Sequence, residues 1–90
     1  MQIFKATLAH IEETSRLFDA YRQFYGQAPD SDEATRFIGE RLQGADSVIF
    51  LARNEAGECA GFVQLYPAFS SVAMKRMWYL NDLYVVESAR

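Results

Sequence analysis

The sequence MKRMWYLNDLYVVESAR, residues 74–90, contains the longest strand-like stretch of the chain and decides how the rest is interpreted. Residues 74–86 are rich in aromatic and β-branched side chains and contain no glycine or proline. That composition is typical of a β-strand. We therefore expect a long strand here, immediately before the end of the sequence.

Two shorter strand-like runs precede this stretch. Residues 47–52 (SVIFLA) form a continuous apolar run, which predicts a strand covered on both faces. Residues 59–66 (CAGFVQLY) form the next run, and we expect Pro67 to end it. The turn residues Asn54–Gly57 separate the two runs. The three strands predict an antiparallel meander, with the longer connection, around residues 68–72, at the lip of a site.

The first half of the sequence has helical periodicity instead. After a short strand at residues 2–6, Thr7 is a plausible N-cap, and a first helix ends at Gly26 and Pro29. Its apolar residues recur at three- and four-residue spacing: Ile11, Leu17, Phe18, Tyr21, Phe24 and Tyr25. A second helix begins with a capping box at Asp30 and ends at Gly44. The element order is β-α-α-β-β-β, an α+β fold with helices covering the meander.

The composition narrows the possible classes of protein. The chain has 90 residues, 50% of them hydrophobic, and a net charge of -3, so we expect one globular domain without a nucleic-acid partner. No apolar run is long enough to span a membrane and the N-terminus lacks a signal-peptide pattern, which predicts a cytoplasmic protein with no membrane partner. One histidine and one cysteine, Cys59, are too few for a metal site.

The end of the chain leads to an expectation about association. The last and longest strand has no following element to pair with its edge, and natural proteins pair, cover or blunt such edges. We therefore expect residues 1–90 to be the N-terminal part of a single domain, or to associate with another copy as a homo-oligomer.

Two of the predicted strands carry a recognisable pattern. Residues 61–66 read Gly-Phe-Val-Gln-Leu-Tyr, and residues 80–85 read Leu-Asn-Asp-Leu-Tyr-Val. With these strands and this order of elements, the chain from residue 3 to residue 90 resembles the GNAT family of acetyl-CoA-dependent N-acetyltransferases. The second strand is similar to the YLED-aromatic-aromatic-V strand of the diamine and spermidine/spermine acetyltransferase branch.

The resemblance implies where acetyl-CoA binds. In the family, the segment matching Leu83, Tyr84 and Val85 bonds the pantetheine chain through its backbone. Arg90 matches the first residue of the Arg/Gln-x-x-Gly-x-Gly/Ala loop that binds the pyrophosphate. The glycines of that loop do not fall within residues 1–90, so we expect the fragment itself to be inactive and the fold to be truncated before this loop.

The resemblance also implies an acceptor site. Phe24 and Tyr25 match substrate-contacting positions of the diamine branch, and aromatic faces suit a cationic amine. Asn81 matches a glutamate of that branch; an amide cannot act as a base but can bond the substrate. Asp82 is a candidate to accept an amine proton through water, or a residue that pairs structurally with an arginine. Alternation places Asn81 and Asp82 on opposite faces of the strand.

The function that follows is transfer of the acetyl group of acetyl-CoA to a primary amine of a small molecule, by direct attack in a ternary complex. This route needs positioning and no covalent enzyme intermediate. A non-enzymatic α+β module that binds a ligand or a protein is the alternative. The catalytic acid and base are not identified among residues 1–90.

Overall fold

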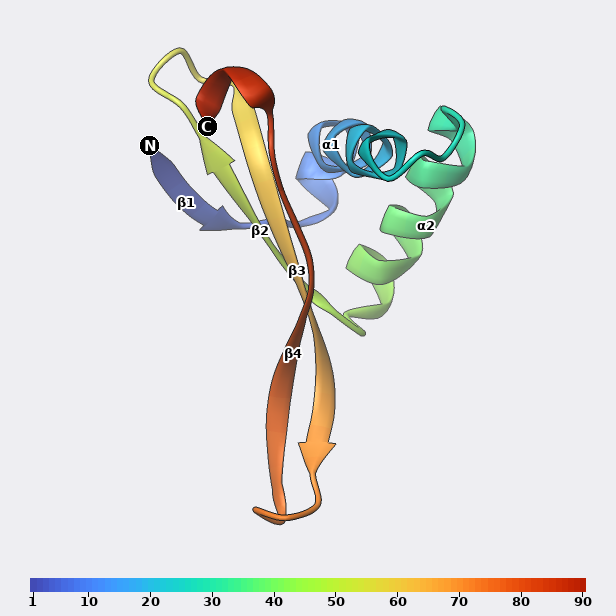
Figure 1. Cartoon of the computed structure of the whole chain (residues 1–90), viewed down its shortest axis with the longest axis vertical. Coiled ribbons are helices and arrows are strands. Elements are labelled where there is room, and N and C mark those ends of the chain that lie inside the picture. The colour runs from blue at the N-terminus through green and yellow to red at the C-terminus, as the bar shows by residue number, and fades with distance from the viewer.

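The computed structural model describes all 90 residues as an α+β fold. The elements in chain order are β1 (Gln2–Lys5), η1 (Leu8–His10), α1 (Ile11–Phe24), α2 (Ser31–Gly44), β2 (Val48–Arg53), β3 (Cys59–Ser70), β4 (Lys75–Val85) and η2 (Glu87–Ala89). The strands form one antiparallel sheet in the order β1-β2-β3-β4. Figure 1 shows α1 and α2 together on one side of this sheet. The predicted fold class and order of elements are therefore confirmed.

The core lies between the two helices and the centre of the sheet. Leu17 of α1 and Ile38 of α2 pack with Ile49, Leu51 and Phe62 of the strands, and all are 3% exposed or less. Along β2 the fully buried side chains alternate with partly exposed ones. The prediction of a β2 strand covered on both faces is therefore wrong for residues 1–90, because both helices cover the same face.

The helix ends follow the predicted capping residues in part. The Thr7 hydroxyl accepts a hydrogen bond from the backbone N–H of Ala9 (3.3 Å), so Thr7 caps the short helix η1, which leads into α1. At the end of α2, Ala45 rather than Gly44 takes the left-handed conformation, with φ of 51°. Gly44 is still helical.

The start of α2 is tied to α1 through a buried carboxylate. Asp30 accepts from the backbone N–H of Glu33 (3.2 Å), as a capping residue does. Its own N–H donates to Asp19 of α1 (3.1 Å) instead of to the Glu33 side chain, so the predicted capping box is only half formed. Asp19, 8% exposed, therefore fixes where α2 begins relative to α1.

The outer parts of β3 and β4 form a long two-stranded arm that projects from the domain (Figure 1). Pro67 does not end β3 as predicted, and the strand continues to Ser70. The last β3 residue that pairs with β2 is Leu65, so Pro67 lies where one edge of β3 is free and a missing N–H is tolerated. The turn at residues 71–74 lies at the tip of the arm, far from the helices, and its place at the lip of a site stays a prediction.

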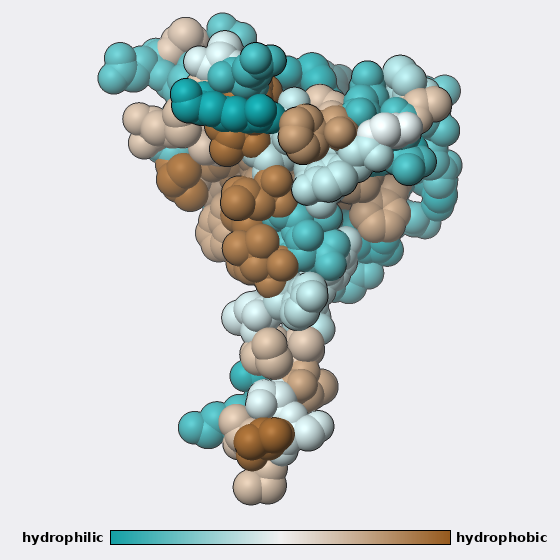
Figure 2. All heavy atoms as spheres, in the orientation of Figure 1, coloured by the Kyte–Doolittle hydropathy of each residue, from teal (hydrophilic) through white to brown (hydrophobic).

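Much of the sheet surface outside the helix-covered face is apolar (Figure 2). The strongly exposed large side chains of the arm and of β4 include Phe69, Trp78, Tyr79, Leu80 and Leu83, each more than 50% exposed. Neither α1 nor α2 is both long and apolar enough to cross a membrane.

Candidate active site between α1 and β4

A β-bulge lies in β4, at the level where it passes the helices. Gln64 of β3 pairs with Asp82 and the next residue, Leu65, pairs with Leu80, so Asn81 has no partner on β3. An extra residue of this kind locally breaks the alternation of side chains and re-aims them. The predicted placement of Asn81 and Asp82 on strictly opposite faces therefore fails, because their side chains touch: Asn81 Nδ2 donates to Asp82 Oδ1 at 3.1 Å.

The Asp82 carboxylate is buried and hydrogen-bonded from several directions. It is 6% exposed, and Gln64 Nε2 donates to its Oδ2 atom at 2.8 Å. Gln64, which is fully buried, accepts in turn from the hydroxyl of Ser47, the residue just before β2 (2.8 Å). A buried charge needs such partners, because an unpaired one carries a large desolvation penalty. Asp82 is thus held in place by Gln64 of β3 and Asn81 of β4, and Gln64 in turn by Ser47.

Tyr21 of α1 lies against the same carboxylate. Burial raises the pKa of Tyr21 to about 12, and the negative charge of the nearby Asp82 adds to the rise. Tyr21 therefore keeps its proton at neutral pH. Burial and the charge of Asp82 also raise the pKa of Tyr66 on β3.

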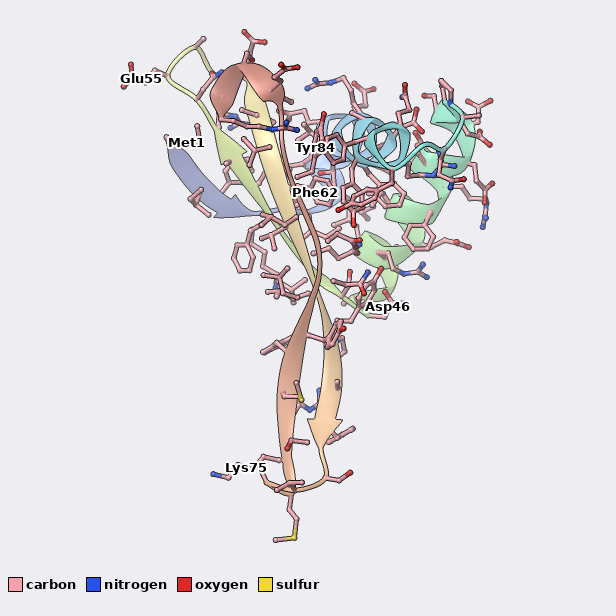
Figure 3. The ribbon with its side chains drawn as sticks, viewed as in Figure 1. Met1, Asp46, Glu55, Phe62, Lys75 and Tyr84 are labelled. Atoms are coloured by element: carbon pink, nitrogen blue, oxygen red, sulfur yellow. The ribbon has the colours of Figure 1, made fainter.

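Aromatic side chains from the last turns of α1 face the end of β4. The ring of Tyr21 lies 5.2 Å from that of Tyr25 and 6.2 Å from that of Tyr84. Phe24 lies 6.2 Å from Tyr84, and both Phe24 (61%) and Tyr25 (67%) are largely exposed. Phe62 and Tyr84 lie side by side on the helix-covered face of the sheet (Figure 3). The rings form a wall whose outer part is open to a ligand.

The free edge of β4 runs beside this wall. The backbone N–H of Val86 donates to Ala60 on β3 (2.8 Å). Because backbone groups in an antiparallel pair alternate in direction, the peptide groups of Leu83 and Val85 point away from β3, towards the edge without a neighbour. The Val85 carbonyl is indeed reached from that side, by Arg90 Nε at 2.7 Å.

Arg90 folds back over the aromatic wall. Its guanidinium carbon lies 5.3 Å from the centre of the Phe24 ring and 5.7 Å from that of Tyr84. The positive charge, the open backbone groups of β4 and the aromatic rings are thus adjacent. Together they suit a ligand with amide groups to pair with the strand and an anionic part near the arginine.

The structure brings the predicted residues to one region. All of them lie where α1 ends and β4 passes it. The residues predicted for the acceptor are Phe24, Tyr25, Asn81 and Asp82, and those predicted for acetyl-CoA are Leu83, Tyr84, Val85 and Arg90. Sequence reasoning did not single out Gln64 or Ser47. The available signal was a lone glutamine among apolar residues in 59–66. The largest surface hollow, about 480 Å³ between η1 and the end of α2, contains none of the predicted residues.

The chain is similar in sequence to known acetyltransferases. No family model matches the chain. All 90 residues align with an uncharacterised N-acetyltransferase, YhfO, of Bacillus subtilis, with 49% identity, and with a probable acetyltransferase of Haemophilus influenzae, with 40% identity. The chain spans about 60% of the length of these curated relatives (60% and 62%).

Solved structures show the same fold. A probable acetyltransferase, 45% identical, superimposes over the whole chain with a TM-score of 0.93, and the chain covers 60% of it. A predicted acetyltransferase from Clostridium acetobutylicum, solved with acetyl-CoA, superimposes with a TM-score of 0.77. The match covers 99% of the present chain and 62% of the Clostridium protein. At 16% identity, that second likeness concerns the fold alone. The resemblance to acetyltransferases of the GNAT fold is confirmed, over the part that this chain spans.

Proposed function

We propose that the whole protein is an N-acetyltransferase that transfers the acetyl group of acetyl-CoA to a primary amine of a small molecule by direct attack in a ternary complex. The observation that carries the proposal is the free edge of β4 at Leu83 and Val85, one residue from the buried Asp82 carboxylate and beside an aromatic wall. The likeness to YhfO over all 90 residues supports it.

The residues of β4 fit the pantetheine part of acetyl-CoA. Pantetheine carries two amide groups. The outward peptide groups of Leu83 and Val85 offer donors and acceptors at the spacing of alternate strand residues, although the Val85 carbonyl already accepts from Arg90. Tyr84 contributes its ring to the wall, and the guanidinium of Arg90 suits a phosphate oxygen. When bound, acetyl-CoA supplies the activated thioester carbonyl. The part of the chain described here orients that carbonyl.

The acceptor amine would lie between the wall and Asp82. The exposed rings of Phe24 and Tyr25 offer faces to an alkylammonium group, and the Asn81 amide offers a carbonyl oxygen to one of its N–H groups. The amine must lose a proton before it attacks, and Asp82 is the nearest carboxylate that can accept a hydrogen bond from it. Much of the rate gain would come from holding both substrates together.

The experiment is a titration of acetyl-CoA by calorimetry, into the whole protein and into residues 1–90 alone, followed by a screen of primary amines with acetyl-CoA. We expect the whole protein to bind acetyl-CoA and to acetylate at least one amine, and the fragment to bind much more weakly. No binding to the whole protein would contradict the proposal. The narrower likeness to the diamine branch stays a prediction, which diamines and spermidine in the screen test.

Self-association also stays a prediction. Trp78 (51%) and Leu80 (55%) on β4 are exposed apolar side chains of the kind that interfaces bury. Light scattering on the whole protein over a range of concentrations decides whether it is a homo-oligomer. A monomer at every concentration would refute the prediction without touching the proposed activity.

A further inference from the structure

We infer that Gln64 is a positioning residue for Asp82, that Ser47 orients the Gln64 amide, and that together they leave acceptor positions of Asp82 open to the amine. The inference rests on the proposed function for what the open position binds. It rests on the structure for the hydrogen-bonded chain Ser47–Gln64–Asp82, which runs from the residue before β2 to β3 and β4.

The chain of hydrogen bonds has a defined direction. An ionised carboxylate only accepts, so the Gln64 amide must turn its N–H towards Asp82 Oδ2 (2.8 Å). Its carbonyl then faces Ser47, whose hydroxyl donates to it at 2.8 Å. If the amide were reversed, its carbonyl oxygen would face a carboxylate oxygen, two acceptors with no proton between them. Ser47 therefore stabilises the amide orientation that suits an ionised Asp82.

The acceptor positions of Asp82 can be counted. A carboxylate offers about four lone-pair positions. Gln64 occupies one on Oδ2 and Asn81 occupies one on Oδ1. One position is left on each oxygen, so a ligand amine that reaches Asp82 can donate N–H groups there. We expect the site to favour amines whose N–H groups can be donated in this direction.

A purely structural role for Gln64 predicts different behaviour. Gln64 is fully buried, so its removal perturbs packing whatever else it does. Gln64→Met keeps the length and volume of the side chain and removes the amide. Gln43→Met makes the same chemical change at an exposed position of α2 with no side-chain hydrogen bond, and is the matched control. Ser47→Ala removes only the group that orients the amide.

The kinetic test uses the whole protein with the amine that it acetylates fastest in the screen. We expect Gln64→Met to raise KM for the amine about tenfold, while KM for acetyl-CoA stays the same and kcat changes less than threefold. Ser47→Ala should raise the amine KM less, and the double variant should be no worse than Gln64→Met, because the residues act in one chain. An equal loss for both substrates, or additive effects, would overturn the positioning role.

A second measurement does not depend on activity. In proton–nitrogen spectra of the whole protein, the side-chain amide of Gln64 should exchange slowly with solvent and should shift in both Ser47→Ala and Asp82→Ala. Gln43→Met should leave it in place. If that amide responds to neither substitution, the chain Ser47–Gln64–Asp82 does not hold it and the inference fails, whether or not any amine is acetylated. If the amide responds but no amine is acetylated, the proposed function fails and the positioning of Asp82 stands.

Discussion

Replacement of Gly61 by alanine probes the edge of β4 directly. Gly61 lies in β3 opposite Val85. A Cβ atom built there would lie 2.9 Å from the carbonyl oxygen of Tyr84 and 3.3 Å from Val85 Cγ2. Ordinary contacts at such a position are 3.4–4 Å, so the backbone of β4 has to move by about 0.5 Å. The atom in the way belongs to the backbone, and no side-chain rotation relieves the contact.

Two effects of Gly61→Ala follow, each with its own assay. Overpacking of this kind costs about 1–3 kcal/mol of folding free energy, which should lower the Tm of the whole protein in circular dichroism. The same movement displaces the peptide groups of Leu83 and Val85. If two hydrogen bonds to acetyl-CoA each weaken by about 0.5–1 kcal/mol, its Kd rises by about 5- to 30-fold. Calorimetry on the folded variant measures that change.

The matched control is Gly44→Ala. Gly44 is the last residue of α2, and a Cβ there would come no nearer than 3.8 Å, to the carboxylate of Asp46. We expect the Tm to stay the same or rise slightly, and acetyl-CoA affinity to be unchanged. If Gly61→Ala keeps the wild-type Kd while its Tm falls, the edge of β4 does not hold acetyl-CoA. If neither quantity changes, the close approach of β3 and β4 at Gly61 is wrong as well.

Three further predictions concern the rest of the site and its support. The pKa of Tyr21 is raised to about 12 from 10.0, so the free energy of unfolding should fall as pH rises from about 10 to about 12, and Tyr21→Phe should flatten that part of the stability profile. Asp19→Ala leaves three donors without their buried acceptor, and we expect a loss of about 2–4 kcal/mol in denaturant unfolding. Tyr25→Ala and Asn81→Ala should each lower kcat/KM for the amine about tenfold, whereas His10→Ala, remote from the site, should leave it unchanged.

The order of elements was predictable because periodicity reports which side of each element is buried. The helical spacing of Leu17, Phe18 and Tyr21 reappears as contacts of α1 with α2 and the sheet. The alternation within residues 47–52 was hidden, because every residue of that run after Ser47 is apolar whether or not it is covered. Hydrophobicity shows what can be buried, and only the placement of the helices shows which face is covered.

The departures from prediction share another cause, which is pairing between strands. Pro67 ends a strand only where a neighbour needs its N–H, and β2 has already ended its pairing at Leu65. The bulge at Asn81 likewise depends on how β4 aligns with β3, and nothing in the local sequence marks it. The contact between Asn81 and Asp82, and the role of Gln64, depend on that alignment and could not be predicted without it.

The alternation along β4 explains how one strand can serve two substrates. Between the bulge and the end of β4, side chains at 82 and 84 face the helices, while the peptide groups of 83 and 85 face the open edge. A ligand paired to the edge at Leu83 would therefore contact the strand residue next to Asp82, whose side chain faces the helices. Asn81 has no partner on β3, so its deletion would leave Leu80 opposite Leu65 and Asp82 opposite Gln64, with Leu83 and Val85 still at the open edge. Deletion of Asn81 should therefore impair amine binding, as Asn81→Ala does, and leave acetyl-CoA binding unchanged. Loss of acetyl-CoA binding on deletion would refute this account of the edge.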